Sequence, residues 1–311
     1  MLFKNLMLDI SLNFPLYHLG LGAAVLIAGI LCFSETIAET IYLHRYLTHN
    51  SLKLNKVVCY VFEFILFFTT GIPPMRWVKI HIKHHQNSDK SGDIHSPVVP
   101  MKIFGLKITG PLVPFLKYFY LYHPYVERYL FIRDSINKAL KYESKFSRIV
   151  FHKLSFLGPI IFVILLTTFF GWTGFIMWLA VFLYLPIVAG AGVNGLGHGS
   201  KEVHTETGDH AHDILSFIEK LPTWAQVVFS PVWLCLKTAL NFMTGGEYRH
   251  YIHHLKLNSA RLTLKKHEFD IGWGVIWLLW KCRLADNIRY ISNKNNEVLL
   301  WLKRDKKLKL A

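Results

Sequence analysis

Histidine is the residue type with the most chemical potential in this chain of 311 residues, which contains 17 of them. Two segments, HIKHH and HYIHH, share a spacing in which the histidines fall at positions i, i+3 and i+4. HRYLTH has two histidines five residues apart, and NGLGH has one. Positions i, i+3 and i+4 lie on one face of a helix, so each HxxHH segment is expected to present its three imidazoles to one point. The candidate residues are His44, His49, His81, His84, His85, His198, His250, His253 and His254.

Metal binding is the chemistry that this pattern indicates. Zinc, copper, iron and nickel all accept neutral imidazole, and one ion takes roughly four to six ligands. Nine imidazoles therefore suit two ions, and we predict a di-metal site. The zinc-hydrolase arrangement HExxH is absent from the sequence. A lone histidine is more often an ordinary core or surface residue, so we assign no role to His18, His123, His152, His204, His210, His212 and His267.

The composition places the site in or beside a membrane. The chain is 52% hydrophobic, above the roughly 45–50% of a soluble domain. Residues 14–43 and 156–193 are long apolar stretches, and the second is broken at Gly171-Trp172-Thr173-Gly174, which leaves room for two helices of ~20 residues. No small-residue cleavage site follows the first stretch, so we expect it to stay in the membrane. We predict an all-α integral membrane protein with a single domain, 1–311, in which 44–155 and 194–311 are cytoplasmic or interfacial.

The topology follows from the need to gather the histidines on one side of the membrane. The first crossing delivers His44 and His49, and the later hairpin returns the chain to the same side. The stretch 57–75 would separate the histidines if it crossed, and it contains Glu63 and the helix breakers Gly71, Pro73 and Pro74. We therefore predict a membrane-surface or re-entrant helix there. The total is three crossings, or four if the first stretch folds into a hairpin, with a helical cap that carries the histidines.

The charge pattern predicts on which side of the membrane the histidine segments lie. The net charge is +15, and basic residues flank the histidine segments, so the positive-inside rule predicts that they are cytoplasmic. Basic runs such as KRDKKLK suit anionic lipid or an acidic partner, whereas the hydropathy argues against nucleic acid. The region 117–153 is expected to form cytoplasmic helices. Two later apolar segments are interrupted by Lys237 and Lys281 and predict interfacial amphipathic helices. The four cysteines form no CxxC pair, so neither a thiolate zinc site nor a disulfide framework is expected.

The histidine segments resemble the boxes of the membrane-bound fatty acid desaturases, specifically the acyl-CoA (stearoyl-type) branch and its bacterial members. HRYLTH, HIKHH and HYIHH resemble the three boxes, and NGLGH resembles an additional box. The likeness continues in GDIHSP, GGEYRHYIHH and SARLTLKKHEFDIGW, and so runs in pieces from about Leu43 to Leu284. The resemblance implies a di-iron centre that uses O₂ and two electrons to introduce a cis double bond into a fatty acyl chain.

The resemblance also implies roles for individual residues. It makes the nine histidines the iron ligands and gives Asn194 the role of holding a metal-bound water. We expect Glu247 and Asp93 to orient imidazoles, because ligating histidines usually donate their second N–H. Trp77 suits either a tunnel wall or a membrane-interface anchor, and the interfacial tendency of tryptophan favours the anchor.

The expected partners follow from the motifs that the sequence contains and lacks. The sequence has no haem-binding HPGG and no ferredoxin-like cysteine cluster, so electrons are expected from a separate ferredoxin or cytochrome with its reductase. The acyl carrier is expected to be coenzyme A, acyl carrier protein or a lipid, and the bacterial inner membrane is the expected location.

Two alternative functions remain open. One alternative is a related di-iron lipid hydroxylase or acetylenase. Another is a non-catalytic metal-binding or transport protein, which is disfavoured because transporters place their ligands near the bilayer midplane.

Overall fold

The computed structural model describes residues 15–93, 95–119, 143–198, 211–263, 268–292 and 295–302. Most of the predicted cytoplasmic helical region 117–153 lies outside the described residues, as does the basic run KRDKKLK. The same is true of the unassigned histidines His123, His204, His210 and His267.

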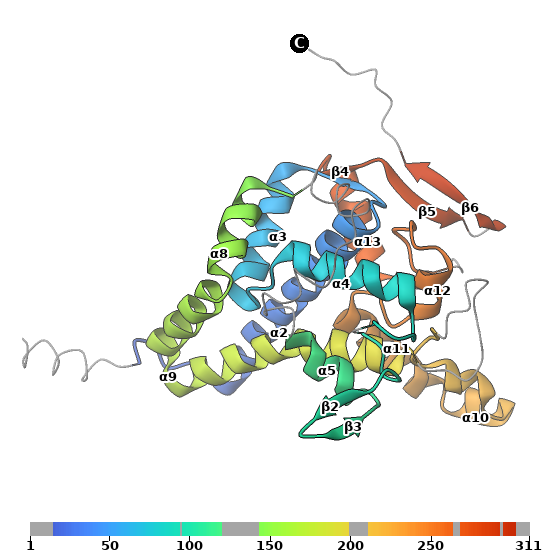
Figure 1. Ribbon diagram of the computed structural model, residues 1–311, viewed down its shortest axis with the longest axis horizontal. Helices are drawn as coiled ribbons and strands as arrows, with labels where there is room; N and C mark the ends of the chain where they lie inside the picture. The colour runs from blue at the N-terminus through green and yellow to red at the C-terminus, as the bar shows by residue number, and fades with distance from the viewer. Residues whose placement is uncertain are drawn as a thin grey trace, which may run out of the picture.

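Two helices of the described chain are long and apolar enough to cross a membrane, Leu21–Thr48 and Leu157–Asn194. The first joins α2 (Leu21–Ile37) to the π-helix η1 (Ala38–Thr48), and the second joins α9 (Leu157–Leu185) to the π-helix η4 (Pro186–Asn194). Gly171 interrupts α9 with φ 60° and ψ −138°, at the predicted turn. The two legs of α9 consequently diverge in a V (Figure 1). The first helix extends past the predicted end at 43 because η1 continues it through His44.

The predicted surface or re-entrant segment is a bent pair of helices, α3 (Lys56–Thr69) and α4 (Pro74–Asn87). The two are bent by 92°, which makes the pair either a broken span or a re-entrant loop. Asn55 caps α3 by accepting a hydrogen bond from the Val57 N–H at 2.8 Å. The break falls at the predicted residues, since Gly71 has φ 65° and Pro74 opens α4. The described chain therefore has two candidate spans, or three if the bent pair counts as one.

Close backbone contact joins α3 to the first leg of α9. A Cβ built on Gly158 would lie 1.9 Å from the backbone oxygen of Phe67, so only glycine allows this approach. The neighbouring Phe67 ring packs edge-on against Phe151 at a centroid distance of 5.4 Å. This contact anchors the helix that leads into α4.

Gly158→Ala is expected to destabilise the protein by about 1–3 kcal/mol, because the added methyl group must push the two backbones apart. The matched control is Gly22→Ala in α2, where a Cβ would meet nothing within 4 Å. Thermal unfolding of both variants in the same detergent measures the difference. Equal midpoints for the two variants would contradict the proposed close contact.

The remaining helices form the cap around the membrane elements. They are α5 (Leu112–Tyr118), the π-helix η3 (Ser147–Phe151), α8 (His152–Leu154), the 3-10 helix η5 (Ser216–Lys220), α10 (Thr223–Val228), α11 (Ser230–Thr244), α12 (His250–Leu255) and α13 (Ile271–Lys281). The predicted interfacial segments correspond to α10–α11 and α13. Their exposed apolar side chains suit a membrane surface, and they include Trp224, Val227, Leu234, Trp277 and Leu278.

The structure is mostly helical, and it adds three short antiparallel sheets that the pattern did not predict. They pair β1 (Lys53–Leu54) with β4 (Ala285–Asp286), β2 (Met101–Ile103) with β3 (Leu106–Ile108), and β5 (Ile288–Ser292) with β6 (Asn295–Leu302). The first sheet ties the segment after η1 to the end of α13, with Lys53 opposite Asp286. All four cysteines are free, as expected.

Candidate metal centre

The nine histidines singled out in the sequence lie in two compact groups. Within each group the candidate ligand atoms all lie within 4.8 Å of one another. Every member is buried except His85, which is half-buried. The first group contains His44, His49, His81, His85 and His253, and the second contains His84, His198, His250 and His254. The structure thus brings together four segments that are far apart in sequence.

The π-helical geometry of η1 positions the first two histidines. The His49 N–H donates to the His44 carbonyl oxygen at 3.1 Å, which is an i to i+5 hydrogen bond. A π turn is wider than an α turn, so residues five apart come onto the same face. The two imidazole centroids lie 4.8 Å apart. The expected loosening of the last turn is therefore a π-helix that begins at Ala38.

Each HxxHH triad is divided between the two groups, which corrects the prediction that a triad converges on one point. In α4, His81 and His85 belong to the first group, whereas His84 belongs to the second. In α12 the division is reversed, since His253 alone joins the first group. Successive residues on a helix diverge by about 100°, so adjacent histidines point to different centres. One triad can therefore serve two centres.

Three carboxylates hold imidazoles in place. Glu247 Oε1 accepts from His44 Nδ1 at 2.9 Å, and Asp93 Oδ2 accepts from His84 Nδ1 at 2.9 Å. Asp89, which the sequence reasoning did not single out, lies 3.1 Å from His198 Nδ1. When Nδ1 carries the donated proton, the Nε2 lone pair is left facing the group, as a metal ligand requires.

The protonation states suit this arrangement. Burial acts to raise the pKa of Asp89, but the hydrogen bond and charge of His198 lower it to about 2. Contacts with His44 and His84 likewise outweigh burial and lower the pKa values of Glu247 and Asp93, respectively. Burial and neighbouring histidines lower the pKa values of the α12 imidazoles well below the usual value. Ionisation of the three carboxylates and the neutral form of the α12 imidazoles are thus both favoured.

The geometry inside the groups fits metal ions. His198 Nε2 and His250 Nε2 are only 2.7 Å apart, and His44 Nε2 and His253 Nε2 are 3.0 Å apart. His49 Nε2 is buried without a hydrogen-bond partner among the described residues. Lone pairs that converge in this way are stabilised by a cation between them. The all-imidazole donor set of each group is consistent with a di-metal site.

A buried arginine stabilises the first histidine group, and the sequence pattern gave no indication of this role. The Arg45 guanidinium donates to the Ala260 carbonyl at 2.9 Å and to the Gly245 carbonyl at 3.0 Å. It also lies 3.4 Å from Glu247 and 3.5 Å from Asp270. Arg45 therefore fixes the carboxylate that orients His44 and ties η1 to the ends of α11 and α13.

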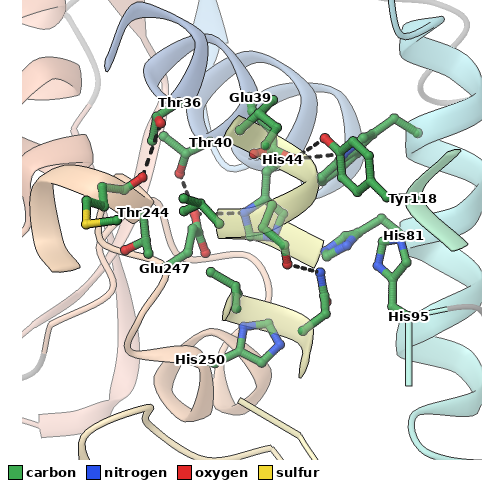
Figure 2. Close-up of a pocket in the computed structure, with 17 residues that line it drawn as sticks. Thr36, Glu39, Thr40, His44, His81, His95, Tyr118, Thr244, Glu247 and His250 are labelled. Carbon is green, nitrogen blue, oxygen red and sulfur yellow. Dashed lines mark hydrogen bonds and ion pairs between the residues drawn. The ribbon is translucent and has the colours of Figure 1, made fainter. Parts of the chain in front are cut away.

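A cavity opens beside both histidine groups (Figure 2). Its wall includes His44 and His81 of the first group, His250 of the second, and Asn194. Asn194 Nδ2 donates to the Ala189 carbonyl at 2.7 Å, while its Oδ1 is buried without a partner among the described residues.

Trp77 belongs to the wall of this cavity. Its side chain is buried, and its ring stacks on His81 at a centroid distance of 4.7 Å. The prediction that Trp77 anchors the protein at the membrane interface is therefore wrong. Sequence spacing could not decide this, because the indole N–H is satisfied by a residue 38 positions away, Glu39.

Asp93→Asn is expected to lower metal affinity by about 10–100-fold, because the amide no longer stabilises the Nδ1–H form of His84 as a carboxylate does. Metal retention during dialysis against graded chelator concentrations measures the loss. Asp286→Asn, in β4 and in neither histidine group, is the matched control and should retain metal as the parent protein does. Identical retention by the two variants would count against an orienting role for Asp93.

Comparison with known proteins shows the family to which this chain belongs. The family model described as fatty acid desaturase matches residues 18–261. The chain is 26% identical to the Delta-9 desaturase-like 2 protein of Arabidopsis thaliana, over 84% of this chain and 75% of that protein. It is 26% identical to the icosanoyl-CoA 5-desaturase of Limnanthes douglasii, over 86% of this chain and 65% of that protein. It is also 24% identical to the hex-5-enoyl-[acyl-carrier protein] acetylenase of Moorena producens (strain JHB), over 83% of this chain and 74% of that protein. With its membrane helices and its two buried histidine groups, this chain belongs to the fatty acid desaturase family.

Proposed function

We propose that this protein uses O₂ and two electrons to introduce a cis double bond into a fatty acyl chain at a pair of iron ions. The observation that carries the proposal is the division of nine histidines into two buried groups that share one cavity. The proposed ligands are these nine histidines, with Asn194 holding a metal-bound water. Two irons, when bound, supply the one-electron chemistry that couples O₂ reduction to the loss of two hydrogens from the chain.

The protein's own residues prepare that chemistry. Asp89, Asp93 and Glu247 hold three imidazoles in the tautomer that presents Nε2 to the metal. Burial of the two groups excludes bulk water, which protects a reactive centre from side reactions. The η4 side of the cavity supplies an apolar wall for an acyl chain, formed by Leu185, Val188, Ala189 and Val193.

The acyl carrier and the electron donor follow from the relatives and from the charge of the chain. The relatives include an icosanoyl-CoA desaturase and an acetylenase of an acyl-carrier-protein substrate, so we propose a fatty acyl thioester as the substrate, with an acyl lipid as the remaining carrier. A separate ferredoxin or cytochrome with its reductase is the proposed electron donor. The net charge of +15 favours an acidic donor surface.

The proposal is tested by mass spectrometry of fatty acids from a host that expresses the chain, with the double bond located. Loss of two hydrogens is the expected change, together with two irons per purified chain. A gain of one oxygen would indicate a hydroxylase instead. Loss of two hydrogens from a chain that is already unsaturated, at the existing alkene, would indicate the acetylenase activity for which the Moorena producens relative is named.

We further propose that the chain acts as a single domain, 1–311, in a bacterial inner membrane with the histidine groups on the cytoplasmic side. The test places cysteines at Asn50 and Asn87 in a chain whose four native cysteines have been replaced. An impermeant thiol reagent should label both positions only when it reaches the cytoplasmic face. Labelling of the two positions from opposite sides would overturn the shared site, because HRYLTH and HIKHH would then face different compartments.

A further inference from the structure

The hairpin formed by β2 and β3 projects from the body of the molecule beside α5 (Figure 1). Ile103 pairs with Leu106 in its register, which leaves Phe104 and Gly105 as the two residues of the turn. Both turn residues have positive φ, 49° and 82°, as a type I′ turn requires. The hairpin contains none of the nine grouped histidines and none of the residues that line the cavity, so the metal centre does not explain its sequence.

Phe104 is an unfavourable residue for this turn. Positive φ strains a bulky side chain, and glycine, asparagine and aspartate are the usual residues at this position. Packing does not offset the strain, because Phe104 is fully exposed, at 102%, and Leu106 beside it is 71% exposed. The tip thus combines backbone strain with exposed apolar surface, and both are features that mark contact sites.

The charges on the hairpin are also unfavourable without a partner. Lys102 and Lys107 are both exposed and lie directly opposite each other in the register, where like charges repel. Neither lysine forms an ion pair with a carboxylate of the described residues. The sheet of β1 and β4 differs, because Lys53 lies opposite Asp286 there. An anionic surface in contact with both ammonium groups would offset their repulsion.

The hairpin is attached beside the end of a candidate membrane span. The chain leaves β3 and enters α5, which packs on η4, the last part of the span Leu157–Asn194. A Cβ built on Gly195 would lie 2.8 Å from Pro111 Cα, and one built on Gly190 would lie 3.2 Å from Phe115 Cα. This close packing fixes the base of the hairpin where the span ends, and lipid headgroups meet a spanning helix at its ends.

We propose that the β2–β3 hairpin is a binding site for anionic lipid headgroups. Phe104 and Leu106 insert into the boundary between headgroups and acyl chains, while Lys102 and Lys107 contact lipid phosphates. An apolar edge flanked by lysines is the arrangement of segments that lie on a membrane surface, and each lysine adds attraction to anionic lipid. A neutral bilayer would satisfy only the apolar tip, and free phosphate only the lysines. The inference does not depend on the reaction at the metal centre.

The first experiment places the photoreactive residue p-benzoylphenylalanine at position 104 of the full-length protein. The protein is reconstituted in nanodiscs of phosphatidylcholine with or without phosphatidylglycerol, and mass spectrometry identifies what the residue cross-links after irradiation. Lipid adducts are expected, and phosphatidylglycerol should raise their rate of formation by about 5-fold or more, the effect of one lysine at an anionic surface. The double change Lys102→Gln and Lys107→Gln should remove this gain, whereas Lys53→Gln should retain it. The same photoreactive residue at Asn258, an exposed turn position after α12, is the control and should give few lipid adducts.

The second experiment removes the ring without weakening the turn. Asparagine is favoured at positive φ, so Phe104→Asn should form the same hairpin with less strain. Trypsin cleaves after lysine, and cleavage at Lys102 and Lys107 should be slow in anionic nanodiscs because the bilayer covers the hairpin. Cleavage should be faster in Phe104→Asn, although its turn is better formed, because the tip no longer inserts.

Several results would overturn the inference. They are the absence of lipid adducts at position 104, a rate of adduct formation that ignores phosphatidylglycerol, equal adduct formation at positions 104 and 258, or unchanged trypsin cleavage in Phe104→Asn. Cross-linking of position 104 to an added acidic electron-transfer protein in place of lipid would also overturn it and would assign the hairpin to that partner. Neither experiment measures desaturation, so failure here leaves the proposed function untouched.

Discussion

Alanine at His84 or His254 is expected to abolish desaturation while leaving the protein in the membrane. Both side chains belong to the second histidine group, which has four members, so either change removes a quarter of its imidazoles. Neither residue lies on a candidate membrane span of Leu21–Thr48 or Leu157–Asn194, so insertion should persist. Alkene formation in membranes with matched protein levels measures the effect.

Because each triad is divided between the two histidine groups, adjacent histidines are expected to affect different metal ions. His84 and His85 are adjacent in α4 but belong to different groups. His84→Ala should therefore lose the ion of the second group, and His85→Ala the ion of the first. Metal content should fall from two ions towards one in each variant, with different spectroscopic signatures for the ion that remains.

His152→Ala is the control for both changes. His152 begins α8 and is not one of the nine grouped histidines, so most activity should remain. Full activity in His84→Ala would show that the groups do not form one functional centre. Loss of both ions from His84→Ala and His85→Ala alike would show that the two sites fill together.

Arg45→Met is expected to have the largest effect on stability, about 3–5 kcal/mol, because it leaves two buried carboxylates without their cation. The Arg45 side chain is 1% exposed, and it contacts the side chains of Glu247 and Asp270, which are 11% and 1% exposed, respectively. It also donates to two backbone carbonyls at the ends of distant segments, Gly245 and Ala260. Denaturant or thermal unfolding in detergent, together with sensitivity to protease, measures the loss.

The matched comparison is Arg148→Ala. The Arg148 guanidinium is also paired, 3.6 Å from Glu143, but its side chain is 61% exposed. Exposed ion pairs typically contribute about 0–1 kcal/mol, so this variant should unfold close to the parent protein. Similar losses for the two arginines would contradict the bracing role of Arg45. In metal-loaded Arg45→Met protein, the spectroscopic signature of the ion in the first histidine group should also change, since Glu247 orients His44.

Local chemistry explains why much of this site could be predicted. Helical periodicity put the imidazoles of each triad on neighbouring faces. The glycines Gly71 and Gly171 marked the bend between α3 and α4 and the kink within α9. Hydropathy identified both candidate spans, because an apolar run of that length has few other uses. The nine histidines that the pattern selected are the nine that the structure gathers.

Other features depended on contacts that no local pattern encodes. Asp89 reaches a histidine 109 residues away, and Arg45 reaches carbonyl groups 200 and 215 residues away. Trp77 was assigned to the interface because tryptophan is common there, yet Glu39 draws it into the cavity. In each case the partner's position is set by tertiary packing.

The sequence alone determined the type and number of the clustered histidines, the apolar helices that are long enough to span a membrane and the family to which the pattern belongs, since each is a property of residue identity and spacing. Only the tertiary structure decided how the triads divide between the two histidine groups, which carboxylates contact the imidazoles and which residues line the cavity beside them. The physical reason is that helix spacing sets the direction of a side chain around its own axis, whereas the partner that it meets depends on how separate helices are packed together.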